Sequence, residues 1–152
     1  MATTITKPKS QRFAISAPYV SAGRINLPLA ATENFWMTIK VNAEGGENAT
    51  HSHLDEDHSF IVLEGEVTFF DEQENAEVLG PYEGIMIPAG AFYRYLNTGE
   101  TNLFLLRVGC RADPNAPKQR IKPDGTPIKG SSKENKHKDG VPIIGKIFGK
   151  QP

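Results

Sequence analysis

Three of the four histidines in this 152-residue chain, His51, His53 and His58, fall within eight residues of one another. If this segment is a strand, His51 and His53 of His-Ser-His point to the same face, because side chains alternate along a strand. His58 follows an acidic bend and could lean back toward the same point. Neutral imidazole binds Fe, Zn, Ni and Mn, so the cluster predicts one divalent transition metal. Ordinary hydrogen-bonded histidines, at the surface or in the core, are the alternative.

The elements that would position these histidines are short strands. From Phe35 to Val41, apolar side chains alternate with Trp36, Thr38 and Lys40, a period of two. Short apolar runs then recur near residue 51 and at 60–63, 67–70, 85–87, 93–96 and 103–108, with turn sequences between them. No segment has a convincing amphipathic helical pattern. The spacing predicts an all-β sandwich or barrel.

Two segments resemble the two sequence motifs of the cupin family. The stretch from Gly45 to Gly65, which contains the histidines, resembles the first motif, and the stretch from Pro88 to Asn97 resembles the second. The resemblance implies a double-stranded β-helix, a jelly-roll-like barrel with extended N- and C-terminal arms and a metal inside one mouth. We expect an N-terminal arm at 1–33 that could include the first strands, a barrel core at 34–110, and an extended, loop-like tail rich in Pro, Gly and Lys at 111–152.

The chain departs from the family pattern at the ligand positions. His58 stands where the family has a glutamate ligand, Tyr93 stands where it has its last histidine, and Tyr82 replaces a glycine. Three readings follow. Tyr93 is a fourth ligand, or it is an acid, base or hydrogen-bond donor beside a three-histidine site, or no metal binds and the pocket holds a ligand by stacking and hydrogen bonds.

The acidic run between the histidines has two readings. The first interpretation is that Asp55, Glu56 and Asp57 form a solvated loop. Alternatively, one of these carboxylates orients an imidazole N–H, or Asp57 replaces the missing glutamate one position early.

Apolar residues near the histidines are candidates for a substrate pocket. Phe60 and Val62 share the inward parity of His58, and Tyr95 shares the face of Tyr93. An earlier strand adds Met37, or else Trp36. An apolar wall with a few polar groups is typical of a small-molecule site, but the same residues could simply form the core.

Charge and composition narrow the functional classes. Residues 1–110 carry 14 acidic and 7 basic side chains, and this balance argues against nucleic-acid binding there. No apolar run is long enough to span a membrane, and no apolar stretch follows the N-terminal basic residues as a secretory signal would require. Cys110 is the only cysteine, which fits a reducing compartment. We therefore expect a cytoplasmic protein with neither nucleic-acid nor membrane partners.

The expected function is a metal-dependent cupin enzyme acting on a small organic molecule, of the oxygenase (possible dioxygenase), isomerase, lyase or cyclase type. His51, His53 and His58 would hold the metal, with Tyr93 as a fourth ligand or a proton donor, and His58 and Tyr93 would take part in catalysis. The alternative is a non-catalytic module that binds a small molecule. The two arms suit exchange between subunits, so we also expect a homodimer.

Overall fold

The computed structural model describes residues 7–152, and this range contains strands, turns and loops but no helix. In chain order the strands are β1 (Ser16–Ala22), β2 (Arg24–Ala31), β3 (Phe35–Asn42), β4 (Gly46–His53), β5 (Asp57–Glu64), β6 (Val67–Phe70), β7 (Ala76–Leu79), β8 (Gly84–Ile87), β9 (Tyr93–Asn97), β10 (Leu103–Cys110), β11 (Arg120–Ile121) and β12 (Val141–Gly149). Paired neighbouring strands are antiparallel. The all-β prediction is confirmed.

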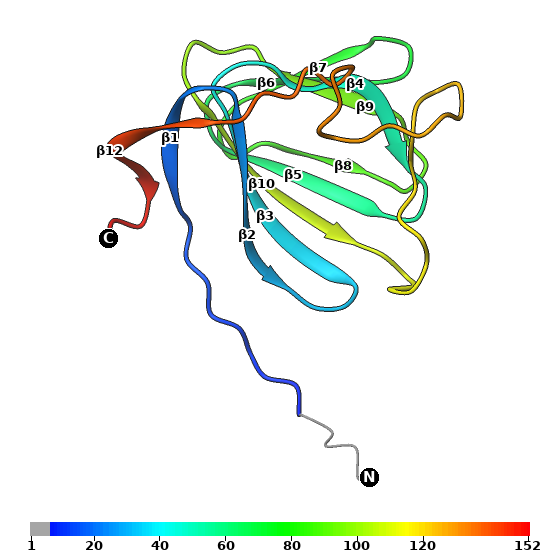
Figure 1. The fold of residues 1–152 in the computed structure, drawn as a ribbon, viewed down its shortest axis with the longest axis horizontal. Helices are drawn as coiled ribbons and strands as arrows, with labels where there is room; N and C mark the ends of the chain where they lie inside the picture. The colour runs from blue at the N-terminus through cyan, green and yellow to red at the C-terminus, as the bar shows by residue number, and fades with distance from the viewer. Residues whose placement is uncertain (1–6) are drawn as a thin grey trace.

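Two five-stranded sheets face each other and form the barrel (Figure 1). One has the order β2-β3-β10-β5-β8 and the other β11-β4-β9-β6-β7. Alternate side chains from both inner faces form a buried cluster, which includes Phe60 and Val62 of β5, Phe69 of β6 and Tyr95 of β9. This arrangement is the predicted double-stranded β-helix, and it fixes which side chains of β4 and β5 can meet inside.

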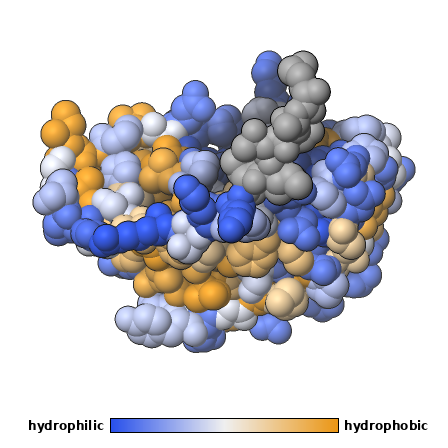
Figure 2. Space-filling model, turned by 90° about the horizontal axis from the view of Figure 1, so that it is seen from below, coloured by the Kyte–Doolittle hydropathy of each residue, from blue (hydrophilic) through white to orange (hydrophobic). Residues whose placement is uncertain are grey.

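The two arms pair with each other on the outside of the barrel. β1 and β12 form a two-stranded antiparallel sheet over the outer face of β3 and β10. Phe148 of β12 stacks on Phe104 of β10 with ring centroids 4.2 Å apart. The tail was expected to be loop-like, but its end is a strand because it finds a partner in β1. Figure 2 shows apolar surface at the end of the molecule where this ribbon lies.

The turn at Tyr82 has a backbone shape that is usual for glycine. Its φ is 71°, in the left-handed region that favours glycine, and its side chain is 91% exposed. At Gly65 (φ 90°) a Cβ would lie 2.6 Å from the carbonyl oxygen of Asn102, so this motif glycine is required by space as well as by backbone angle. Both turns therefore have backbone angles that favour glycine.

Candidate metal centre

The structure brings the three predicted histidines to one end of the barrel interior. β4 carries His51 and His53 on its inner face, and His58 enters from the start of β5. The ring centroids of His51 and His53 are 5.2 Å apart, and those of His53 and His58 are 4.4 Å apart. Strand alternation and the bend between β4 and β5 therefore place three imidazoles next to one another.

Glu56, rather than His51, completes the tightest group of donor atoms. Its Oε2 lies 3.0 Å from His58 Nε2 and 3.3 Å from His53 Nδ1. Among the described residues, donor atoms of these three side chains all lie within 4.8 Å of one another. Ligands bound to one ion at about 2.1 Å and at right angles are about 3 Å apart. The three side chains therefore fit a single ion.

The expectation that the acidic run forms a solvated loop is wrong for Glu56, which is only 5% exposed. Its neighbours hold the bend in place. Asp55 pairs with Arg111 at 2.9 Å, and Asp57 accepts a hydrogen bond from the backbone N–H of Ala89 at 2.8 Å. Both neighbours make their contacts outside the histidine cluster, and Asp57, the expected replacement for a glutamate ligand, is not among the clustered donors.

His51 lies deeper than the other two histidines. Its Nδ1 bonds the carbonyl oxygen of Ala49 at 2.8 Å, which leaves Nε2 without a hydrogen-bond partner, 3.4 Å from Glu47 Oε2. His53 Nε2 is also buried without a hydrogen-bond partner. Buried polar atoms are normally satisfied, so two unpartnered imidazole nitrogens in one cluster fit a site that takes a metal or a ligand.

Burial keeps the imidazoles of His53 and His58 neutral. It lowers the pKa of His53 to about 2, with further lowering from the neighbouring His58 and Arg107. Burial also lowers the pKa of His58, although Glu56 opposes this shift by accepting a hydrogen bond from its ring. Neutral imidazole is the form that binds metal ions, so the cluster is prepared for a metal near neutral pH.

Tyr93 is used as a hydrogen-bond donor. Its hydroxyl donates to Glu47 Oε2 at 3.1 Å, while Lys40 Nζ lies 3.0 Å from Glu47 Oε1. Burial, followed by the negative charge of Glu47, raises the pKa of Tyr93 well above its usual value of 10.0. Burial opposes ionisation of Glu47 itself, but the charge of Lys40 and the nearby His51 ring hold its pKa well below 4.5. A neutral phenol beside a carboxylate favours the interpretation of Tyr93 as a hydrogen-bond donor over its interpretation as a metal ligand.

Most of the residues predicted to form an apolar pocket wall do not line the cavity beside the histidines. Phe60, Val62 and Tyr95 are fully buried in the core, where rings such as those of Phe60 and Tyr93 pack 5.8 Å apart. These three do not line the cavity beside His53. Met37 is on the outer face of β3, because it shares parity with the outward Ile39. The substrate-pocket role assigned to Met37 is therefore wrong.

The cavity that does reach the histidines has a volume of about 260 Å³. Its lining residues are Trp36, His53, Glu56, Arg107, Lys118, Gln119 and Arg120. We call it the mouth. Sequence reasoning missed Arg107 and the three tail residues. The parity of Arg107 with Leu103 and Leu105 was a usable signal, whereas the position of the tail was not visible in the sequence.

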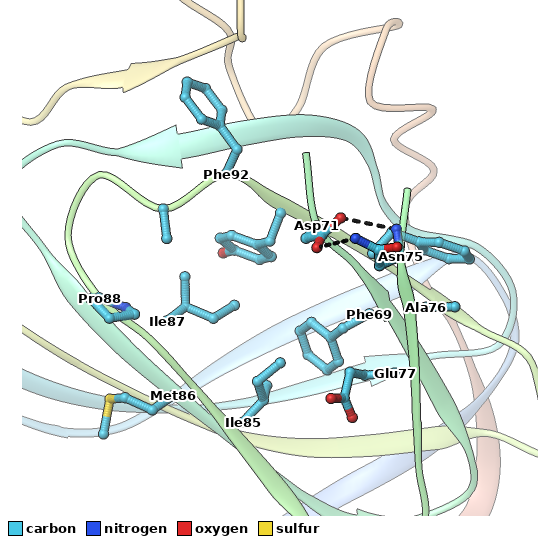
Figure 3. A pocket seen from close by; sticks show the side chains of 13 residues that line it. Phe69, Asp71, Asn75, Ala76, Glu77, Ile85, Met86, Ile87, Pro88 and Phe92 are labelled. Atoms are coloured by element: carbon cyan, nitrogen blue, oxygen red, sulfur yellow. Dashed lines mark hydrogen bonds between the residues drawn. The ribbon is translucent and has the colours of Figure 1, made fainter. Parts of the chain in front are cut away.

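A second cavity, of about 290 Å³, opens between the edge strands β7 and β8. Phe69, Ile85 and Ile87 point into it (Figure 3). At its rim, Asp71 accepts a hydrogen bond from the Asn75 side chain at 2.9 Å. This cavity is mainly apolar, and His53, Glu56 and His58 do not line it.

The comparisons agree with this fold. The cupin domain family matches residues 35–109, and with the observed fold this match shows that the chain belongs to the cupin superfamily. A solved structure from Thermus thermophilus is 25% identical, with a TM-score of 0.56, over 62% of this chain and 90% of that one. A Klebsiella pneumoniae protein with a double-stranded β-helix domain is 17% identical, with a TM-score of 0.57, over 67% of this chain and 80% of that one.

An oxalate oxidase in complex with glycolate is also similar, with 19% identity and a TM-score of 0.52, over 67% of this chain and 56% of that one. At this identity the likeness shows the fold alone. Comparison with curated protein sequences gives no match. Residues 7–152 contain no helix long and apolar enough to cross a membrane.

Proposed function

We propose that this chain is a metal-dependent cupin enzyme that acts on a small organic molecule at the mouth. The observation that carries the proposal is the convergence of His53, Glu56 and His58 donor atoms within 4.8 Å at the wall of a cavity. Two histidines and one carboxylate, with positions left for substrate, are typical of non-haem Fe(II) sites. Mn, Ni and Zn suit the same donors. His51 is the candidate fourth ligand.

The residues around the ligands have separate tasks. A bound divalent ion would polarise a carbonyl or enolate oxygen, or serve as the place where O2 and substrate meet. Glu56 supplies the anionic donor that the motif position of His58 lacks. Tyr93 keeps its proton and donates to Glu47, which holds that carboxylate 3.4 Å from His51 Nε2. The aromatic packing under the histidines excludes water from the inner side of the site.

Cytoplasmic location and self-association are further parts of the proposal. Cys110 is a free, half-buried thiol, which supports a reducing compartment. Among residues 7–152 the outer edge of β12 has no strand partner, which supports a homodimer. The reaction class includes oxygenase, isomerase, lyase and cyclase chemistry, and the non-catalytic binding module is the competing function.

Turnover distinguishes the enzyme from the binding module. Protein loaded with Fe(II), Mn, Ni or Zn is incubated with a panel of hydroxy-acids, dicarbonyls and phenols, with substrate loss and oxygen uptake recorded together. We expect conversion of at least one compound, abolished in Glu56→Gln and retained in Asp57→Asn. Asp57 is the matched control because it is an exposed carboxylate next to Glu56. If compounds raise the melting temperature but none is converted with any metal, the binding module is the correct function.

A further inference from the structure

The mouth carries an excess of positive charge. Arg107, Lys118 and Arg120 line it, against the single carboxylate of Glu56. The nearby pair of Lys40 and Glu47 lies deeper, and its two charges balance. A cavity lined by one sign of charge concentrates the opposite sign, so the mouth attracts anions even without a metal ion.

Two of these three cations come from the C-terminal tail. β11 pairs with β4 so that Arg120 stands opposite His53, and the backbone N–H of Leu54 donates to the carbonyl oxygen of Gln119 at 3.1 Å. Lys118 lies over Trp36, with its Nζ 5.9 Å from the ring centroid. The match to the cupin family ends at residue 109. The tail therefore adds side chains to the mouth that the matched barrel does not contain.

The guanidinium groups have donors to spare. Arg107 Nε, Arg120 Nε and Arg120 Nη2 are buried without hydrogen-bond partners. Arg120 Nη2 is 3.8 Å from Glu47 Oε1, too far for a hydrogen bond. Arg107 Nη2 contacts the His58 ring nitrogens at 3.1 and 3.3 Å, which leaves its Nε free. Unpartnered buried donors are costly, and a carboxylate matches the planar fork of arginine.

We propose that Lys118 and Arg120, together with Arg107, bind a carboxylate group of the molecule on which the metal acts, so that the tail determines the substrate class. The part played by the metal rests on the proposed function, whereas binding of the anion does not. A cavity of about 260 Å³ equals the volume of roughly nine water molecules, which suits a compact acid.

Malonate is a suitable probe because malonamide has the same shape without the charge. Metal-free, full-length protein is titrated with each compound by calorimetry and by fluorescence of Trp36, the only tryptophan of the chain. Malonate should bind saturably and malonamide should not. Lys118→Gln and Arg120→Gln should each weaken malonate binding about tenfold, since charge-assisted hydrogen bonds are lost. Lys133→Gln is the matched control, because Lys133 is an exposed tail lysine outside the mouth.

The outcomes separate this inference from the proposed function. If malonate does not bind although the protein binds a metal, the carboxylate site is wrong and the metal proposal stands. If malonate binds but no metal does, the carboxylate site stands and the metal proposal is wrong. Equal affinity in Lys118→Gln, Arg120→Gln and Lys133→Gln, with unchanged melting temperatures, would overturn the role of the tail. Tighter binding of inorganic phosphate than of malonate would overturn the carboxylate assignment.

Discussion

Single side chains give the site its sensitivity to acid. His53 and His58 are held neutral by burial, and Glu56 and Glu47 are held ionised although they are buried. In the folded protein, protonation of these histidines and glutamates is unfavourable. The unfolded chain therefore takes up protons at a higher pH than the folded chain does. The free energy of unfolding of the metal-free protein must therefore depend on pH in a direction that these shifts determine.

The folded pKa of His53, about 2, lies below its usual value of 6.5, so the unfolded chain binds more protons below about pH 6.5. We expect the free energy of unfolding to fall as the pH drops from 7 to 5, by up to about 1.4 kcal/mol per pH unit for each proton. Below about pH 4.5 the two glutamates add a loss of the same sign. Urea titrations at several pH values measure this slope. His53→Asn should reduce it, and an equal slope in both proteins would contradict the account.

The histidine cluster could be predicted from the sequence, but the sequence did not show that Glu56, of the three acidic residues, turns toward it. The His-Ser-His spacing fixes one face of a strand locally, whereas the direction of Glu56 depends on distant partners, Arg111 for Asp55 and Ala89 for Asp57. Lys40 and Glu47 were missed for a similar reason. Each is an ordinary surface residue type, and its burial becomes favourable only when the two meet across strands.

At the scale of elements, β12 closes the outer core. Short alternating runs and turn glycines are local signals, so the barrel strands could be predicted from the sequence. The pairing of β12 with β1 joins segments more than a hundred residues apart, and the tail therefore looked like a loop. The same is true of β11, which carries Arg120 to the mouth.

Phe148 is the side chain that tests the role of β12. Its ring stacks 4.2 Å from that of Phe104, so Phe148→Ala should lower the free energy of unfolding. We expect about 2 kcal/mol, less than the roughly 3–5 kcal/mol for a fully buried ring, because Phe148 is half-buried. Chemical denaturation measures the change. Val78→Ala is the control, since Val78 is 59% exposed on the edge strand β7 and lies outside the β1–β12 ribbon. Equal effects of the two substitutions would show that β12 does not stabilise the barrel.

At the scale of the whole molecule, the β1–β12 ribbon presents the apolar end seen in Figure 2. Val141, Ile143 and Ile144 are exposed on a strand whose outer edge is unpaired among residues 7–152. Association of two copies along this edge would satisfy backbone groups and cover apolar surface. We therefore expect a dimer by analytical ultracentrifugation.

Ile144→Asp should shift this dimer toward monomer without changing the melting temperature of the barrel. Val78→Asp is the control, because Val78 is exposed on a different sheet edge, at β7. A monomeric wild-type protein, or a dimer disrupted by Val78→Asp and not by Ile144→Asp, would show that the ribbon is not the interface.

The central claim, that His53, Glu56 and His58 hold one metal ion, is tested most directly by metal stoichiometry. Metal-free protein is dialysed against Fe(II), Mn, Ni or Zn, and bound metal is measured by elemental analysis. We predict one ion per chain for the wild-type protein and for Asp57→Asn, and strongly reduced binding for Glu56→Gln and His53→Asn at unchanged melting temperature. Wild-type protein that binds none of the four metals, or full binding in both Glu56→Gln and His53→Asn, would contradict the account.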